Sequence, residues 1–320
     1  MSACLICLRE FEGAGHYHTH CLRSLFGAAR VPEPVDIDLA RLYTIGLAMV
    51  GRVSISGVQR KISVSLSADR RTLHVALGGG LFILKPQAST FPELPENEIV
   101  TMRLAQLAEI DIPPCGLLPL EDGTPAYVVK RFDRTDAGGK LRMEDFCQLA
   151  GLPPKQKYDG SAELCARLVR QFTSEPLVES LKLFRRMAFC WWSGNGDAHL
   201  KNFALLTGAD GLVRLSPAYD LLCTRLAIPA DRLALPVGGK TDGLTRRHWE
   251  QYGQYCALPS RSIDRELARI ARTLDAAIDL VSRSPLGEAG RARYIELLRA
   301  RATVLSGAPD PGSHPGPAQP

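Results

Sequence analysis

The chain has 320 residues, of which 45% are hydrophobic and 23% charged, a composition typical of a globular protein with one two-lobed unit or two domains. Its 39 basic and 34 acidic residues give a net charge of +5, too mild to indicate nucleic-acid binding by itself. We find no apolar run of about 18 residues and no signal-peptide pattern, so we expect a cytoplasmic chain without a membrane span.

Residues 1–27 contain cysteines and histidines at the spacing of a metal site. Cys4 and Cys7 form one pair, and His18 and Cys21 form a second, each with two intervening residues. Ten residues separate the pairs, and each pair can supply two ligands to tetrahedral Zn²⁺. The rival ligands are His16 and His20, and the alternative is a short apolar strand with incidental cysteines. We interpret the segment as zinc-binding-like, whereas the scattered cysteines are expected to be small buried apolar side chains. The four expected ligands are Cys4, Cys7, His18 and Cys21.

Residues 28–132 are expected to form a β-rich lobe with a phosphate loop. Short alternating or apolar runs are typical of strands, and the glycines at 78–80 indicate a turn. One helical segment, NEIVTMRLAQLAEI, ends at the IPP of 112–114. The strand-like runs are VSISGVQRKISVSLS, TLHVAL, LFILK and AYVVKRF.

Residues 133–305 are expected to form a helical lobe that carries the catalytic loop. Apolar residues recur at helical spacing, and Ser161 is a typical N-cap. The last residues, 306–320, contain too much Pro and Gly to fold and are interpreted as a disordered tail. The predicted fold class is therefore α+β, with two lobes. The expected helices cover 161–172, 177–192, 262–282 and 286–305.

The segment GNGDAHLKN at 194–202 is a polar loop between the apolar MAFCWW and the strand-like FALL. Asp197 and Asn202 stand five apart, as in kinase catalytic loops, where an aspartate accepts the substrate hydroxyl proton and an asparagine binds metal. Asp220 follows the hairpin-like FALLTGADGLVRL, where a carboxylate can face this loop. The pattern predicts Asp197 as the catalytic base, and Asn202 and Asp220 as Mg²⁺ ligands beside ATP.

Lys85 closes the strand LFILK, where a kinase needs an ammonium group to meet the ATP phosphates. Either Glu98 or Glu96, in the helix that follows, can pair with it. The small residues of SISGVQRK at 54–61 allow backbone amides to approach a triphosphate, although a single Gly57 differs from the Gly-rich loop of ordinary kinases.

Eight short sequence segments, spread over roughly residues 54–225, resemble in content and order the HipA family of bacterial serine/threonine kinases. The resemblance implies a two-lobed protein-kinase-like fold, Asp197 as base, Lys85 as an ATP contact, and Mg²⁺ at Asn202 and Asp220. The strings are SISGVQRK, FILKP, ENE, VVKRFDR, EDFCQLAG, KYDG, GNGDAHLKN and SPAYDLL. The nucleotide contacts that it implies are Ser56, Gly57, Val58, Gln59, Arg60, Lys61, Lys130, Arg131, Phe132, His199 and Lys201.

The resemblance also implies regulation and partners. Similar proteins phosphorylate themselves on loop serines, so Ser54 and Ser56 are expected autophosphorylation sites, with ordinary turn serines as the alternative. Only about fifty residues precede the loop, which makes the chain most similar to the short HipT toxins of three-component systems. These imply a HipB-like DNA-binding antitoxin, a small HipS-like protein, and a protein substrate such as an aminoacyl-tRNA synthetase. A small-molecule kinase and a catalytically silent co-repressor are the alternative functions.

Overall fold

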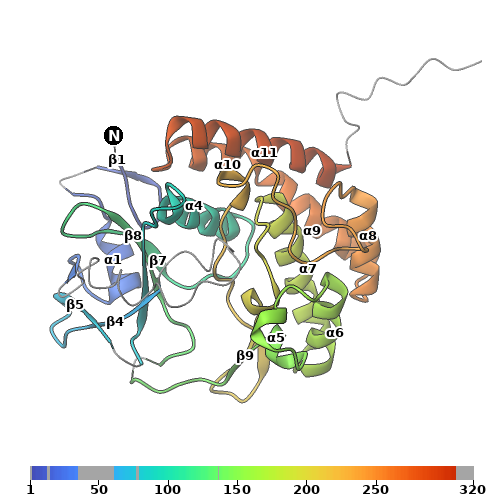
Figure 1. Ribbon diagram of the computed structural model, residues 1–320, viewed down its shortest axis with the longest axis horizontal. Coiled ribbons are helices and arrows are strands. Elements are labelled where there is room, and N and C mark those ends of the chain that lie inside the picture. Colours follow the sequence, from blue (N-terminus) through green and yellow to red (C-terminus); the bar gives the residue numbers. More distant parts are fainter. Residues whose placement is uncertain (1, 13–14, 35–60, 77–78, 136, 308–320) are drawn as a thin grey trace, which may run out of the picture.

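The structure is a computed structural model that describes residues 2–12, 15–34, 61–76, 79–135 and 137–307. Figure 1 shows the β-rich part of the chain beside a larger helical part, with helix α4 (Leu94–Leu107) above the sheet. Within the described ranges, no helix combines the length and the apolar composition needed to cross a membrane.

A six-stranded sheet in the order β3-β5-β4-β6-β8-β7 forms the centre of the β-rich lobe. Its neighbouring strands are antiparallel, except for the parallel pair β3 and β5. Ile62 and Val64 are buried on one face of β4, as an alternating sequence predicts. The strands are β3 (Glu33–Pro34), β4 (Ile62–Leu66), β5 (Thr72–Val75), β6 (Phe82–Pro86), β7 (Cys115–Pro119) and β8 (Pro125–Lys130).

The N-terminal segment packs onto this sheet. It contains the short antiparallel strands β1 (Ser2–Ala3) and β2 (Glu10–Phe11) and the helix α1 (Thr19–Phe26), which ends at Gly27 with a positive φ. The buried face of α1 joins the same hydrophobic cluster as strands β4, β6 and β8. The described residues of this segment therefore share a core with the β-rich lobe.

Helix α4 is buried on nearly every side, because it contacts β7 and β8 on one face and α10 on the other. It therefore lacks the clear apolar stripe of a surface helix. This position between the lobes matters for the site, since α4 carries Glu98.

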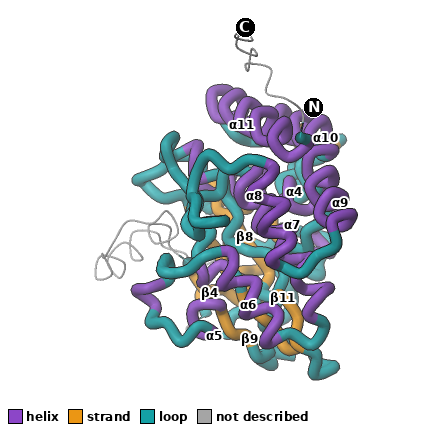
Figure 2. Tube along the Cα trace, turned by 90° about the vertical axis from the view of Figure 1, so that its right-hand side faces the viewer, coloured by secondary structure: helices purple, strands orange, loops and turns teal. Residues whose placement is uncertain are grey.

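The helical lobe surrounds the long helix α7, whose side chains Phe184, Phe189 and Trp192 are fully buried. Figure 2 shows α6, α7, α8 and α9 grouped on one side of the molecule. A small sheet in the order β11-β10-β9 lies at the edge of this lobe. The elements are β9 (Met143–Asp145), α5 (Phe146–Leu149), η2 (Pro154–Gln156), α6 (Ala162–Phe172), α7 (Pro176–Trp192), η3 (Leu200–Asn202), β10 (Ala204–Thr207), β11 (Val213–Leu215), η4 (Thr224–Leu226), α8 (Arg246–Tyr255), α9 (Ser260–Arg272), α10 (Leu274–Ser282) and α11 (Glu288–Ser306).

Several expected boundaries differ from the structure. The helix expected over 262–282 is divided at Thr273, whose hydroxyl donates to the carbonyl of Ile270 at 2.7 Å and so competes with the helical pattern. The expected tail starts later, because Ser306 is the last residue of α11, and residues 308–320 lie outside the described part. The glycine turn at 78–80 is described only from Gly79 onward.

Candidate active site

A cavity of about 1030 Å³ lies where residues of both lobes meet. Its lining includes seven Lys or Arg residues and only three Asp residues, so it favours a polyanionic ligand. The lining residues are Lys61, Arg131, Asp133, Arg134, Lys140, Met143, Asp145, Gln148, Pro154, Lys155, Lys157, His199, Lys201, Asn202, Tyr219 and Asp220.

Lys85, Glu98 and Asp220 form a buried ionic centre at the edge of this cavity. The Lys85 ammonium donates to Glu98 Oε1 at 2.5 Å and also to Asp220 Oδ1. Lys61 donates to the other oxygen of Asp220 at 2.6 Å. Of the two glutamates that the sequence left open as partners of Lys85, the structure pairs Glu98 with it. Strand β6, helix α4 and the segment after β11 each contribute one of the three central residues.

Lys85 and Asp220 stabilise each other's charges, whereas burial, together with the charge of Asp220, raises the pKa of Glu98. Burial opposes the charged form of Lys85, but the carboxylates of Asp220 and Glu98 outweigh it and raise the pKa of this lysine. Burial likewise opposes ionisation of Asp220, but Lys61 and Lys85 hold its pKa far below the usual range. Lys85 is therefore charged and Asp220 ionised at neutral pH.

The loop 194–202 leaves helix α7 through two positions that require glycine. Gly194 has a φ of +80°, and a Cβ there would lie 2.8 Å from the Cys223 sulfur. A Cβ on Gly196 would lie 2.6 Å from the backbone oxygen of Arg232. The loop thus packs against the chain that follows Asp220, which explains why the motif contains both glycines.

The end of this loop is held by hydrogen bonds around Asn202. The side-chain oxygen of Asn202 accepts from the backbone N–H of His199 at 3.1 Å, and the backbone N–H of Asn202 donates to the His199 carbonyl at 2.9 Å. Tyr219 donates to the Lys201 carbonyl at 2.9 Å. Asn202 is consequently fixed at the cavity, which Asp220 also lines.

Asp197 accepts a hydrogen bond of 2.7 Å from the hydroxyl of Tyr158. Tyr158 lies in the string KYDG, and no local pattern indicates this role, because the two residues are 39 positions apart and only the fold joins them. Within the described ranges, neither Asp197 nor Lys85 lines the cavity itself; Lys157, the neighbour of Tyr158, does.

His199 lies between these groups as a buried, neutral ring. Burial lowers its pKa to about 4, although the charges of Asp197 and Asp220 partly oppose this. His199 and Asp220 both line the cavity, so the loop and Asp220 border the same space. The ring packs edge-on against Tyr158, with centroids 5.2 Å apart.

Comparison with known proteins assigns the chain to a family. Residues 53–278 match the family described as HipA-like C-terminal domain. The chain belongs to this HipA-like family. A Sinorhizobium fredii protein provisionally named as kinase Y4mE is 32% identical over 272 residues, which make up 77% of this chain and 64% of that relative. The chain thus spans less than two thirds of the length of this relative.

Two solved structures share the fold. A chain from the Shewanella oneidensis toxin–antitoxin complex of HipA, HipB and operator DNA matches with a TM-score of 0.68 and 23% identity, covering 80% of this chain and 66% of that one. The Helicobacter pylori proinflammatory kinase CtkA matches with a TM-score of 0.54 and 14% identity, covering 73% and 92%. The HipA-like chain therefore has the two-lobed, kinase-like α+β fold predicted from its sequence.

Only some of the other nucleotide contacts that the HipA resemblance implies line the cavity. Among residues 130–132, Arg131 lines it and is held by Asp133 at 2.7 Å, while Phe132 packs on Tyr219 with ring centroids 5.6 Å apart. Lys130 ends strand β8. Lys201 lines the cavity and pairs with Asp145 at 2.8 Å.

The phosphate loop is seen only at its last residue. Lys61 contacts Asp220, as described above. The other residues of the expected loop lie outside the described part of the chain, so their roles stay predictions. They are Ser54, Ser56, Gly57, Val58, Gln59 and Arg60.

The expected zinc ligands are brought together away from this cavity. The ligand atoms of Cys4, Cys7, His18 and Cys21 all lie within 4.8 Å of one another. The rival His16 is not a member of this group.

Proposed function

We propose that this chain is an ATP-dependent kinase that transfers the γ-phosphate to a serine or threonine of a protein. The observation that carries the proposal is the buried Lys85–Glu98 pair, joined to Asp220 at the edge of a strongly basic cavity. A kinase needs this combination, because an anchored ammonium and a metal-binding carboxylate must both meet the phosphates of ATP.

The donor set fits Mg²⁺. Asn202 and Asp220 both line the cavity and offer the hard oxygen ligands that this ion prefers next to phosphate oxygens. Lys61 and Lys85 already neutralise Asp220, which suits a position that receives a divalent cation. When bound, Mg²⁺ would neutralise charge on the phosphates. The ammonium of Lys61 would then turn from Asp220 to the phosphates.

Asp197 is the proposed base. The substrate hydroxyl oxygen forms a bond to the γ-phosphorus while the bond to the β,γ-bridging oxygen breaks, ADP leaves, and Asp197 accepts the hydroxyl proton. The hydrogen bond from Tyr158 fixes the orientation of this carboxylate. His199, neutral beside it, adds no charge that would compete for the proton.

We extend the proposal to a toxin role. The solved Shewanella complex contains HipA, HipB and operator DNA of a toxin–antitoxin system. By analogy, we propose a HipB-like antitoxin and a small HipS-like protein as partners of this chain. DNA contact would then run through the antitoxin. The proposed target is a protein of translation such as an aminoacyl-tRNA synthetase, with autophosphorylation at Ser54 or Ser56 lowering the affinity for ATP.

The test is phosphoproteomics after brief expression of the wild type and of Asp197→Gln, followed by incubation of each purified protein with Mg²⁺·ATP and lysate. The proposal predicts labelled protein serines or threonines, and phosphate on Ser54 or Ser56, with the wild type alone. Labelled metabolites in place of proteins would favour a small-molecule kinase. Equal labelling with both proteins would reject Asp197 as base, and absence of any transfer would favour a silent co-repressor.

A further inference from the structure

The cluster of Cys4, Cys7, His18 and Cys21 has the dimensions of an occupied tetrahedral site. Nδ1 of His18 lies 3.4 Å from the sulfur of Cys7 and 4.0 Å from the sulfur of Cys21. Neighbouring ligand atoms around Zn²⁺ are about 3.4–3.8 Å apart, as follows from bond lengths of roughly 2.0–2.3 Å. The two measured separations therefore bracket the expected edge of the tetrahedron.

The backbone on either side arranges these ligands. His18 is the N-cap of α1 and Cys21 lies in its first turn, so one helix start presents both side chains. Cys4 and Cys7 lie in a tight turn that is closed by the Leu8 N–H bonding to the Cys4 carbonyl at 2.8 Å. Leu8, which follows, has a φ of +57°, a left-handed conformation uncommon for leucine. The backbone N–H of His18 donates to the Cys4 sulfur at 3.4 Å, which links the two pairs.

We propose that these four residues hold one Zn²⁺ ion and that the metal fastens the N-terminal segment to helix α4 and to the helical lobe. Three cysteine sulfurs and an imidazole form a set that binds Zn²⁺ and leaves no open position for catalysis, so the site is structural. His20 is excluded from the set, although its Nε2 lies 3.3 Å from the Cys21 sulfur, because His18 already lies between two sulfurs.

The chain that would be fixed by the metal makes three separate backbone contacts with its surroundings. The carbonyl of Leu5 accepts from the Leu117 N–H in β7 at 2.8 Å. The carbonyl of Ile6 accepts from Arg103 Nε in α4 at 2.7 Å, and that of Leu8 from Arg283 Nε at 3.0 Å, beyond the end of α10. Residues 5–8 thus join the sheet, α4 and the helical lobe.

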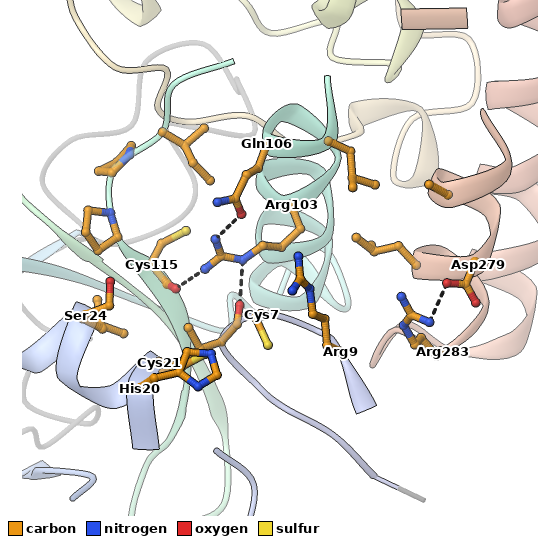
Figure 3. Close-up of a pocket in the computed structure, with 18 residues that line it drawn as sticks. Cys7, Arg9, His20, Cys21, Ser24, Arg103, Gln106, Cys115, Asp279 and Arg283 are labelled. Atoms are coloured by element: carbon orange, nitrogen blue, oxygen red, sulfur yellow. Dashed lines mark hydrogen bonds and ion pairs between the residues drawn. The ribbon is translucent and has the colours of Figure 1, made fainter. Parts of the chain in front are cut away.

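Arg103 is the central link. It is 8% exposed, and besides Ile6 it donates to the Cys115 carbonyl at 2.6 Å and to Gln106 at 2.9 Å (Figure 3). Glu98, the partner of Lys85, lies on the same helix. Residues five positions apart point about 140° apart around a helix, so Arg103 and Glu98 lie on different sides of α4. Fixing residues 4–7 therefore supports α4 on a side other than the one that carries Glu98.

Cys7 and Cys21 border a cavity of about 510 Å³, which also includes Arg103 and Arg283 (Figure 3). Cys7 is only partly buried, so a metal bound to it can be reached from solvent. A strong chelator should remove the metal without prior unfolding, and Co²⁺ should replace it and produce the intense visible absorption of a tetrahedral thiolate site.

The first experiment measures metal in the full-length protein, purified without chelator, and needs no nucleotide. We expect one Zn²⁺ per chain in the wild type and its loss in Cys4→Ser/Cys7→Ser and in His18→Ala. His18→Cys should retain the metal, because a fourth thiolate replaces the imidazole. His20→Ala and Cys147→Ser, which changes a buried cysteine outside the cluster, serve as controls that keep one Zn²⁺. Wild type free of metal, or loss of metal in His20→Ala with retention in His18→Ala, overturns the assignment.

The second experiment tests the link to α4. Removal of the metal should lower the melting temperature by several degrees, and re-addition of Zn²⁺ should restore it. Arg103→Met should keep one Zn²⁺ per chain but reduce the shift on chelation to a small fraction of the wild-type value, because the fixed segment no longer holds α4. An undiminished shift in Arg103→Met rejects this link. The phosphotransfer proposal is untouched by either result, since neither measurement uses ATP.

Discussion

The two sides of the candidate active site are organised by different forces. On one side, Asp220 is held by the ammonium groups of Lys61 and Lys85, and Lys85 also contacts Glu98. On the other side, Asp197 accepts a hydrogen bond from the hydroxyl of Tyr158, and the backbone of His199 holds Asn202. Ion pairs therefore organise the first, charged side, whereas hydrogen bonds from uncharged donors hold the carboxylate and the amide of the second side.

This difference assigns distinct tasks to the two sides. Ammonium groups that neutralise a carboxylate in the free protein can turn to phosphates when ATP enters, so the charged side should determine nucleotide affinity. A loop fixed by hydrogen bonds from uncharged donors changes little on binding and should determine the rate of transfer. Substitutions on one side should therefore alter Kd, and those on the other should alter kcat.

Asp197→Gln should give the largest effect. Removal of a general base typically lowers kcat about 10²–10⁴-fold, while ATP affinity should stay close to wild type because the base acts on the hydroxyl. Single-turnover phosphotransfer and calorimetric ATP titration measure the two quantities. Asp210→Asn, on an exposed turn between β10 and β11, is the matched control. A loss of ATP affinity equal to the loss of rate would remove the distinction between the two sides.

Asp220→Asn should act on the charged side and weaken Mg²⁺·ATP binding by roughly 10–100-fold, since a hydrogen bond to a charged group contributes about 1.5–3 kcal/mol. Activity should fall with the affinity. Titration with Mg²⁺·ATP, and with ATP in the presence of a chelator, separates the metal effect from the effect on lysine pairing. Unchanged Mg²⁺·ATP affinity would exclude Asp220 from the metal site.

Sequence patterns found much of this arrangement because the relevant signals are local. The hairpin of β10 and β11 places Asp220 at its end as the turn sequence predicts, and Lys85 lies on β6 as its position in LFILK indicates. The N-cap role expected of Ser161 is confirmed, since its hydroxyl accepts from the Leu164 N–H at 3.2 Å.

Features that depend on tertiary contacts were missed. Strand β7 was not expected, because four of its five residues are buried and its sequence does not alternate. Helix α8 has few apolar residues, and only the burial of Trp249 and Tyr252 reveals its inner face. Tyr158 could not be paired with Asp197, since no spacing rule connects residues 39 positions apart.

His199 provides a test that uses pH. Its pKa is about 4 in the folded protein, against 6.5 in an unfolded chain, so only the unfolded chain gains a proton in the interval between these values. Stability from this group is fully present above about pH 6.5 and is lost as pH falls towards 4, by an amount on the order of 3 kcal/mol. His199→Gln should flatten this part of the profile of unfolding free energy. His248→Gln, on the histidine that caps α8, should leave it unchanged, and an equal slope in both variants would contradict the assignment.

Tyr158→Phe should give the smallest effect and is the most specific test of the side that holds Asp197. The ring remains, so its packing against His199 should survive, whereas the hydroxyl that donates to Asp197 is removed. We expect kcat to fall roughly tenfold, near the lower end of the range of about 1.5–3 kcal/mol for a hydrogen bond to a charged group, because this bond orients the base and takes no part in the transfer. ATP affinity and the melting temperature should change little. Tyr17→Phe removes a hydroxyl that donates to the Leu117 carbonyl in the N-terminal segment, and it should leave kcat unchanged. If the Tyr158→Phe variant bound ATP more weakly but kept the wild-type kcat, this tyrosine would serve the charged side of the site.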